Sequence, residues 1–230
     1  MKKLFTQPLI IGTRTKVTIL LAAMSLLSFS LSMFRVYKTN HSLFLFLNWN
    51  LFLAFVPWVL TSIVMLSPNL KKRKWILTPL FISWVLFFPN APYILTDLFH
   101  LRVDTKVPIW FDLVLILSFA WTGLLFGLVS LFDMEKLLSQ FVNKRITTAI
   151  SVFLLFVSGF GIYIGRFLRW NSWDVLNNPM KLMGDIADRF IDPNSHPRTW
   201  AVTILMGLFL NMIYWSIRLL KTEEGKISNY

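Results

Sequence analysis

The residues best suited to chemistry lie in one short stretch, which runs from Phe88 to Arg102. Tyr93, Asp97 and His100 are spaced i, i+4 and i+7, so in a helix they would share one face. A carboxylate and an imidazole on one face could act as acid and base, or as two ligands of a metal ion. In the structural alternative, Asp97 caps a helix or forms a salt bridge and His100 lies at a membrane interface. The sequence favours neither.

The same stretch interrupts an apolar segment with two prolines. Residues 75–88 would form about 21 Å of helix, which is shorter than the roughly 30 Å hydrocarbon core of a bilayer. Proline removes a backbone donor and disfavours helix in the residue before it, so we expect Phe88 and Ala91 to be extended. Asn90 could satisfy a freed carbonyl while capping the next helical segment, whose amino terminus would favour an anionic group.

A second group of polar residues follows the predicted fifth helix. Arg166 and Arg169, at i and i+3, could present guanidinium groups to a carboxylate or phosphate, or could pair with an aspartate of the chain. Polar groups within a membrane usually face the bundle interior, so we expect a polar chamber in the outer half of the bundle. Independent capping and kink repair would be the alternative. The ligand-binding candidates are Asn50, Asn90, Tyr93, Asp112, Arg166, Arg169, Asn171 and Asp174.

Composition indicates the elements that must position these residues. The chain has 230 residues, 56% hydrophobic and 16% aromatic, and its mean hydropathy of +0.62 is that of a membrane protein. A crossing helix needs roughly 20 mostly apolar residues. We therefore predict an all-α bundle of about six transmembrane helices in one domain, 1–230. The predicted helices are 17–34, 43–66, 75–99 with a break at 89–92, 110–132, 146–168 and 199–220.

A short amphipathic helix is expected between the fifth and sixth transmembrane helices. Asn178 and Pro179 would begin it, and it would end before Pro193. Such a helix rests on the membrane surface, either as a simple connector or as a lid over the chamber. Within the fifth helix, Gly161 and Gly165 form a Gly-x-x-x-Gly pair that permits close approach of another helix.

The charge distribution predicts orientation and partners. The net charge is +12, and 14 of the 23 Lys and Arg residues fall on the side of the membrane that holds both termini. Basic loops favour the cytoplasmic side, so we expect both termini in the cytoplasm and contacts with anionic lipids there. This distribution argues against nucleic-acid binding. The chain has no cysteine and no familiar phosphate-loop or zinc motif, so we predict no metal, and no cofactor or protein partner is indicated.

Three motifs resemble a known family. They are Trp49–Ala54 with Pro57, Phe88–Tyr93 with Thr96–Leu98 and His100–Leu101, and Arg166–Asp174. Together they resemble the bacterial integral membrane family called domain of unknown function 1361, over nearly the whole chain. The resemblance implies a multi-pass protein of the bacterial cytoplasmic (inner) membrane. It supplies no substrate, cofactor or catalytic residue.

Three functions remain open from the sequence. A membrane-embedded protein could bind or act on a lipid or lipid-linked anionic group, with Asp97 and His100 transferring protons and Arg166 and Arg169 holding the head group. A carrier of a small solute or ion could use the broken third helix as part of its binding site. In the third case the protein has a structural role without catalysis, and the polar motifs only stabilise the fold.

Overall fold

The computed structural model describes residues 2–67, 69–70, 73–101 and 107–227, and it contains no strand within these ranges. Six described helices are long and apolar enough to cross a membrane, so the predicted all-α transmembrane bundle is confirmed. The elements are α1 (Lys2–Thr39), α2 (Phe46–Leu66), α3 (Lys74–Phe87), α4 (Asn90–Tyr93), the 3₁₀ helix η2 (Ile94–His100), α5 (Ile109–Leu138), α6 (Lys144–Phe167), α7 (Asp174–Asn177), α8 (Pro179–Ile191), the 3₁₀ turn η3 (Pro193–Ser195) and α9 (Pro197–Ile227).

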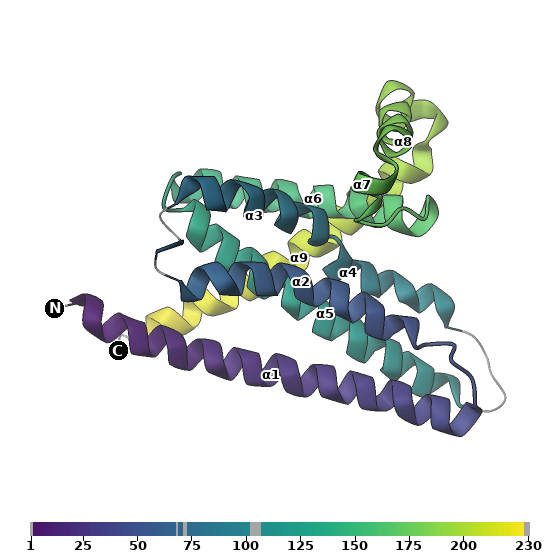
Figure 1. Cartoon of the computed structure of the whole chain (residues 1–230), viewed down its shortest axis with the longest axis horizontal. Helices are drawn as coiled ribbons and strands as arrows, with labels where there is room; N and C mark the ends of the chain where they lie inside the picture. The colour runs from purple at the N-terminus through teal and green to yellow at the C-terminus, as the bar shows by residue number, and fades with distance from the viewer. Residues whose placement is uncertain (1, 68, 71–72, 102–106, 228–230) are drawn as a thin grey trace.

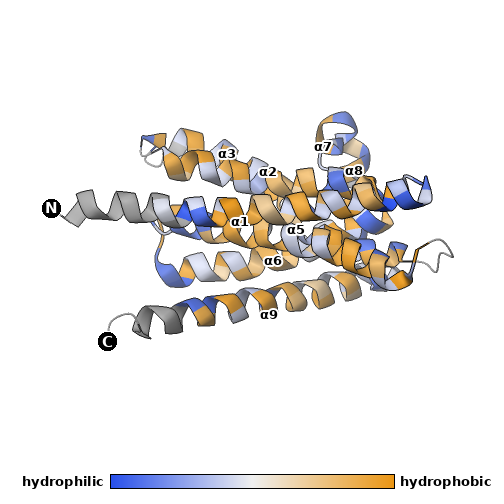
Figure 2. Ribbon diagram, turned by 90° about the horizontal axis from the view of Figure 1, so that it is seen from below, coloured by the Kyte–Doolittle hydropathy of each residue, from blue (hydrophilic) through white to orange (hydrophobic). Residues whose placement is uncertain are grey.

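The beginning of α1 and the end of α9 lie at one end of the bundle, and α8 lies at the opposite end (Figure 1). Hydrophobic residues fill the middle of the helices, and hydrophilic residues gather toward both ends of the bundle (Figure 2). This distribution fits a multi-pass membrane protein. Lys71, Lys72 and the side chains of Lys2, Lys3, Lys74 and Lys226, which contribute to the basic side of the sequence, lie outside the described part of the chain.

Two Arg–Asp pairs join α1 to the central helix α5. Arg35 donates to Asp112 through Nε (2.6 Å) and Nη2 (2.9 Å), and Arg14 Nη1 lies 2.8 Å from Asp133 Oδ2. The two arginines are 21 positions apart in the sequence, and so are the two aspartates. At 1.5 Å per residue this is about 32 Å, close to the thickness of the hydrocarbon core. The pairs therefore lie near the two ends of the membrane-spanning part of α1.

The third transmembrane segment keeps a helical backbone through its break. Phe88 has φ −56° and ψ −40°, and Ala91 lies within α4. The expectation that both residues are extended is therefore wrong. A helical path preserves local hydrogen bonds, from Ala91 N to Phe88 O (3.1 Å) and from Tyr93 N to Pro89 O (3.0 Å). Such bonds are favoured at membrane depth because lipid supplies no alternative partner.

Glycines on two neighbouring helices let them approach this break closely. A Cβ atom at Gly127 of α5 would lie 2.8 Å from the Cβ of Ala91, and one at Gly161 of α6 would lie 2.8 Å from the Cβ of Pro89. The close packing expected from the glycine pair of α6 is confirmed, and the partner is the broken segment itself. The break is thus held between α5 and α6.

The contact between α6 and α9 gives a test of this close packing. A Cβ at Gly159 would lie 2.6 Å from the backbone oxygen of Thr203, so we expect Gly159→Ala to destabilise the protein by about 1–3 kcal/mol. Gly184 in α8 has no neighbour within 4 Å, and Gly184→Ala should be neutral or stabilise by up to about 1 kcal/mol. Thermal unfolding of both variants in one detergent measures the difference. Equal stability of the two variants would contradict the close α6–α9 contact.

Candidate functional site

Arg166, near the end of α6, fastens this helix to η2. Its Nε donates to Thr96 Oγ1 (2.9 Å), its Nη1 lies 2.9 Å from His100 Nε2, and its Nη2 donates to Asp97 Oδ1. The guanidinium carbon also lies 4.5 Å from the centre of the Tyr93 ring. One cation therefore holds three side chains of a single 3₁₀ helix and the face of a fourth residue next to it.

The contact with Arg166 determines the hydrogen-bonding role of His100. A guanidinium group only donates hydrogen bonds, so His100 Nε2 must accept. In this arrangement Nδ1 carries the ring hydrogen. The His100 ring also packs edge-on against Phe46, with 5.1 Å between ring centres. His100 is therefore held by α6 on one side and by the first turn of α2 on the other.

The 3₁₀ geometry brings Asp97 and His100 to the same side of the segment. Three residues per turn place positions i and i+3 on one face. This segment is thus a 3₁₀ helix and not the expected α-helix. Asp97 is 1% exposed, and its second oxygen accepts from Asn50 Nδ2 at 2.8 Å. Each carboxylate oxygen thus has a donor, and the negative charge is paired with Arg166, as a buried charge requires.

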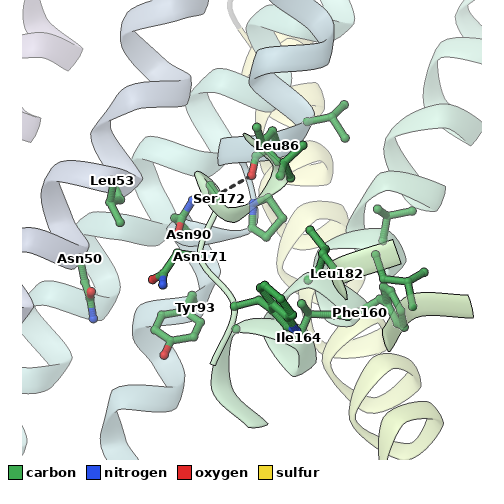
Figure 3. Close-up of a pocket in the computed structure, with 18 of the residues that line it drawn as sticks. Asn50, Leu53, Leu86, Asn90, Tyr93, Phe160, Ile164, Asn171, Ser172 and Leu182 are labelled. Carbon is green, nitrogen blue, oxygen red and sulfur yellow. Dashed lines mark hydrogen bonds between the residues drawn. The ribbon is translucent and has the colours of Figure 1, made fainter. Parts of the chain in front are cut away.

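A cavity of about 330 Å³ lies beside this cluster, between α2, the broken third segment, α6 and α8. Most of its wall is apolar, and its hydrogen-bonding side chains come from α2, α4 and the loop after α6. Figure 3 shows Asn50, Asn90, Asn171 and Tyr93 around a common space. A mostly apolar cavity with a few convergent polar groups is the usual form of a ligand site. The lining residues with a hydrogen-bonding side chain are Trp49, Asn50, Asn90, Tyr93, Trp170, Asn171 and Ser172.

The loop after α6 also repairs the break in the third segment. Asn90 Nδ2 donates to Phe87 O (2.9 Å), and Ser172 Oγ donates to Leu86 O (3.1 Å). Asn90 Nδ2 donates to Ser172 Oγ as well (3.0 Å). The expected role of Asn90 at a freed carbonyl is confirmed, whereas its expected role as a helix cap is not found, since α4 has no side-chain cap. The same two side chains satisfy the break and line the cavity.

Three candidate residues lie away from the cavity wall. Asp112 is bound to Arg35, and Asp174 accepts from the backbone nitrogen of Asn171 at 2.7 Å. Arg169 follows the end of α6 with a left-handed φ of 63°, and its side chain is exposed. The structure thus brings four candidates to the cavity and places Asp97, His100 and Arg166 behind its wall. The four are Asn50, Asn90, Tyr93 and Asn171.

Helix α8 covers one side of the cavity. The helix begins at Pro179 as the sequence predicts, and Leu182 and Ile186 line the cavity. Trp170 Nε1 donates to Asp185 Oδ2 at 2.7 Å, which ties α8 to the loop after α6. Just beyond α8 and outside the membrane-spanning segments, hydrogen bonds from the Ser195 side chain and backbone lower the pKa of the Asp192 carboxyl. This turn is therefore stable at neutral pH and weakens only as the pH falls through that lowered value.

Comparison with known proteins assigns the family. The family model described as "Protein of unknown function (DUF1361)" matches residues 49–213. This chain belongs to the DUF1361 family. The match contains every cavity-lining residue. It begins after α1, so it covers less of the chain than the expected resemblance over nearly the whole chain. No curated protein and no solved structure matches the DUF1361 chain.

Two residues of the site in this DUF1361 chain, and one buried residue outside it, were missed in the sequence. Thr96 and Ser172 are small hydroxyl residues with no distinctive spacing, so no signal marked them. Arg35, outside the site, lies just beyond the predicted first helix (17–34), whereas α1 continues to Thr39 and buries this arginine. Its side chain is 1% exposed and is bound to Asp112. Within the described residues, no group of three His, Asp or Glu side chains could hold a metal ion.

The Asp97–Arg166 pair can be tested by charge removal. Asp97 and Arg166 have side-chain exposures of 1% and 12%. We expect Asp97→Asn to cost about 3–5 kcal/mol, because it leaves the buried guanidinium without its counter-charge. The double variant Asp97→Asn/Arg166→Gln should lose less stability than the summed losses of the single variants Asp97→Asn and Arg166→Gln. Thermal unfolding in detergent measures all four proteins.

Arg169→Gln is the matched control, because it removes an exposed guanidinium three residues from Arg166. It should change the free energy of unfolding by less than about 0.5 kcal/mol. If Asp97→Asn were equally harmless, the ion pair would not stabilise the fold, and a role of Asp97 in chemistry would gain support.

Proposed function

We propose that this DUF1361 protein binds a lipid or a lipid-linked anionic group in the 330 Å³ cavity, near the outer face of the bacterial cytoplasmic membrane. The single observation that carries the proposal is the composition of the cavity wall. Apolar side chains such as Leu53, Val85 and Ile164 provide a surface for a hydrocarbon chain. The amides and hydroxyls at its polar side suit a head group.

The position of the cavity within the bundle supports a lipid ligand. Its wall includes the first turns of α2, the break in the third segment and the last turns of α6, all within helices that can cross a membrane. Next to it, α8 exposes Met180 (83%) and Ile191 (82%). An exposed apolar face on a short amphipathic helix suits the boundary between head groups and acyl chains. A lipid could thus reach the cavity without leaving the membrane.

The outer location rests on the distribution of basic residues. Helix α8, which lines the cavity through Leu182 and Ile186, lies at the end of the bundle opposite the two termini (Figure 1). Basic loops favour the cytoplasm, and the side that holds the termini carries 14 of the 23 basic residues. The cavity would then face the outer leaflet, and the basic loops would contact anionic lipids of the inner leaflet.

Binding is better supported than catalysis by the geometry of Asp97 and His100. Both side chains are held by Arg166, and neither belongs to the cavity wall. Proton transfer would require Arg166 to release His100 Nε2, so the catalytic assignment of these two residues stays a prediction. A carrier mechanism would require the break to open, against the hydrogen bonds that Asn90 and Ser172 make across it.

Filling the cavity tests the proposal. Val157→Trp would place an indole in the cavity, whereas Val114→Trp would place one on an exposed position of α5 (49% exposed). We expect the wild type and Val114→Trp to retain about one lipid per chain after purification in mild detergent, and Val157→Trp to lose it. Lipid extraction and mass spectrometry measure retention, and gel filtration checks folding. Equal lipid content in all three folded proteins would refute binding in this cavity.

A further inference from the structure

Three amide side chains in the cavity have orientations fixed by their partners. Each amide nitrogen donates to a group that can only accept, so each amide oxygen must point the other way. Asn90 and Asn171 come from α4 and from the loop after α6, whereas Asn50 comes from α2. The three bonds run from Asn50 to the Asp97 carboxylate (2.8 Å), from Asn90 to Phe87 O (2.9 Å) and from Asn171 to the Asp174 carboxylate (3.3 Å).

The hydrogen-bonding groups left in the cavity include both acceptors and donors. The oxygens of Asn50, Asn90 and Asn171 accept no hydrogen bond from any residue in the described part of the chain, and all three side chains line the cavity (Figure 3). The second N–H of Asn50 and of Asn171, the Tyr93 hydroxyl and the Trp49 indole N–H donate to no group in the described part of the chain. Other donors are already used. Both amide hydrogens of Asn90, the hydroxyl of Ser172 and the indole N–H of Trp170 donate to protein groups. A ligand that both donates and accepts hydrogen bonds would complete this site.

The cavity wall carries no formal charge. None of its described lining residues is Lys, Arg, His, Asp or Glu. Behind the wall, the charges of Asp97 and Arg166 offset each other. A charged group buried in such a cavity would lack a counter-charge, which is costly. For this reason neither an anion nor an ammonium group suits the interior.

We propose that the part of the ligand inside the cavity is an uncharged group with several hydroxyls, such as the sugar or glycerol head group of a lipid. This inference rests on the proposed function and names the chemical class of its ligand. Hydroxyls both donate and accept, so they can bind the three amide oxygens and the remaining N–H groups of Asn50 and Asn171.

An anionic part of the same lipid would lie at the rim of the cavity. Arg169 is exposed and directly precedes the lining residues Trp170 and Asn171. It makes no ion pair with any residue that the structure describes. A phosphate next to Arg169 would stay hydrated on one side while the hydroxyl-bearing group enters the cavity.

Matched lipid pairs test the hydroxyl requirement. The full chain in nanodiscs is offered dioleoyl lipids that differ only in the head group, and the bound lipid is measured by native mass spectrometry. Phosphatidylglycerol should be retained about tenfold or more over phosphatidic acid, and monoglucosyl-diacylglycerol likewise over diacylglycerol, because two or more hydrogen bonds are gained. Phosphatidylethanolamine, which offers an ammonium group, should bind no better than phosphatidic acid.

Asn171→Ala tests the amide oxygens directly. This residue lies outside the transmembrane helices and does not hold the break, and the change should lower retention of phosphatidylglycerol about fivefold through loss of one hydrogen bond. Asn194→Ala, which removes an exposed amide in η3, is the matched control and should change nothing.

Each other result has a definite meaning. Tighter binding of phosphatidic acid or phosphatidylethanolamine than of phosphatidylglycerol would overturn the hydroxyl requirement and leave lipid binding intact. Unchanged retention of phosphatidylglycerol by Asn171→Ala would have the same meaning. If no lipid is bound more by the wild type than by the cavity-filled Val157→Trp variant, the proposed function itself fails, and this inference fails with it.

Discussion

The structure depends on one constraint, that a broken helix inside a membrane must have its polar groups satisfied by protein. Two prolines interrupt the third transmembrane segment, and lipid offers no hydrogen bonds to replace those they remove. The chain meets this need with side chains from α4, α6 and the loop after α6. Asn90 and Ser172 donate to the free carbonyls, and Arg166 binds the following 3₁₀ helix. The cavity lies where these elements meet.

Buried charges in this bundle occur as pairs that join distant parts of the chain. Arg35 with Asp112 and Arg14 with Asp133 join α1 to α5, and Arg166 with Asp97 joins α6 to η2. Pairing removes the cost of placing a lone charge among apolar helices, so these residues select which helices become neighbours. It also leaves the region behind the cavity neutral overall, because the charges of Asp97 and Arg166 offset each other.

The uncharged wall of the cavity favours ligand binding over acid–base chemistry at the polar cluster. Viewed as isolated side chains, Asp97, His100 and two arginines suggest acid–base chemistry on an anionic group. In the fold, one arginine is committed to Asp97 and His100, and the other lies outside the cavity. The groups that face the open space are amides and hydroxyls, which bind and orient but do not transfer protons readily at neutral pH. The geometry therefore supports recognition more strongly than catalysis.

The sequence by itself determined the all-α class, the six crossing helices, the start of α8 and the position of the break, because hydropathy and proline act locally. It also predicted that Asn90 serves a freed carbonyl. The pairing of Arg166 with Asp97, 69 positions away, is known only from the fold. The same holds for the pairing of Asp112 with Arg35, 77 positions away. Several aspartates were chemically equivalent partners in the sequence. The choice among them depends on which helices pack together, and local sequence patterns carry little information about that packing.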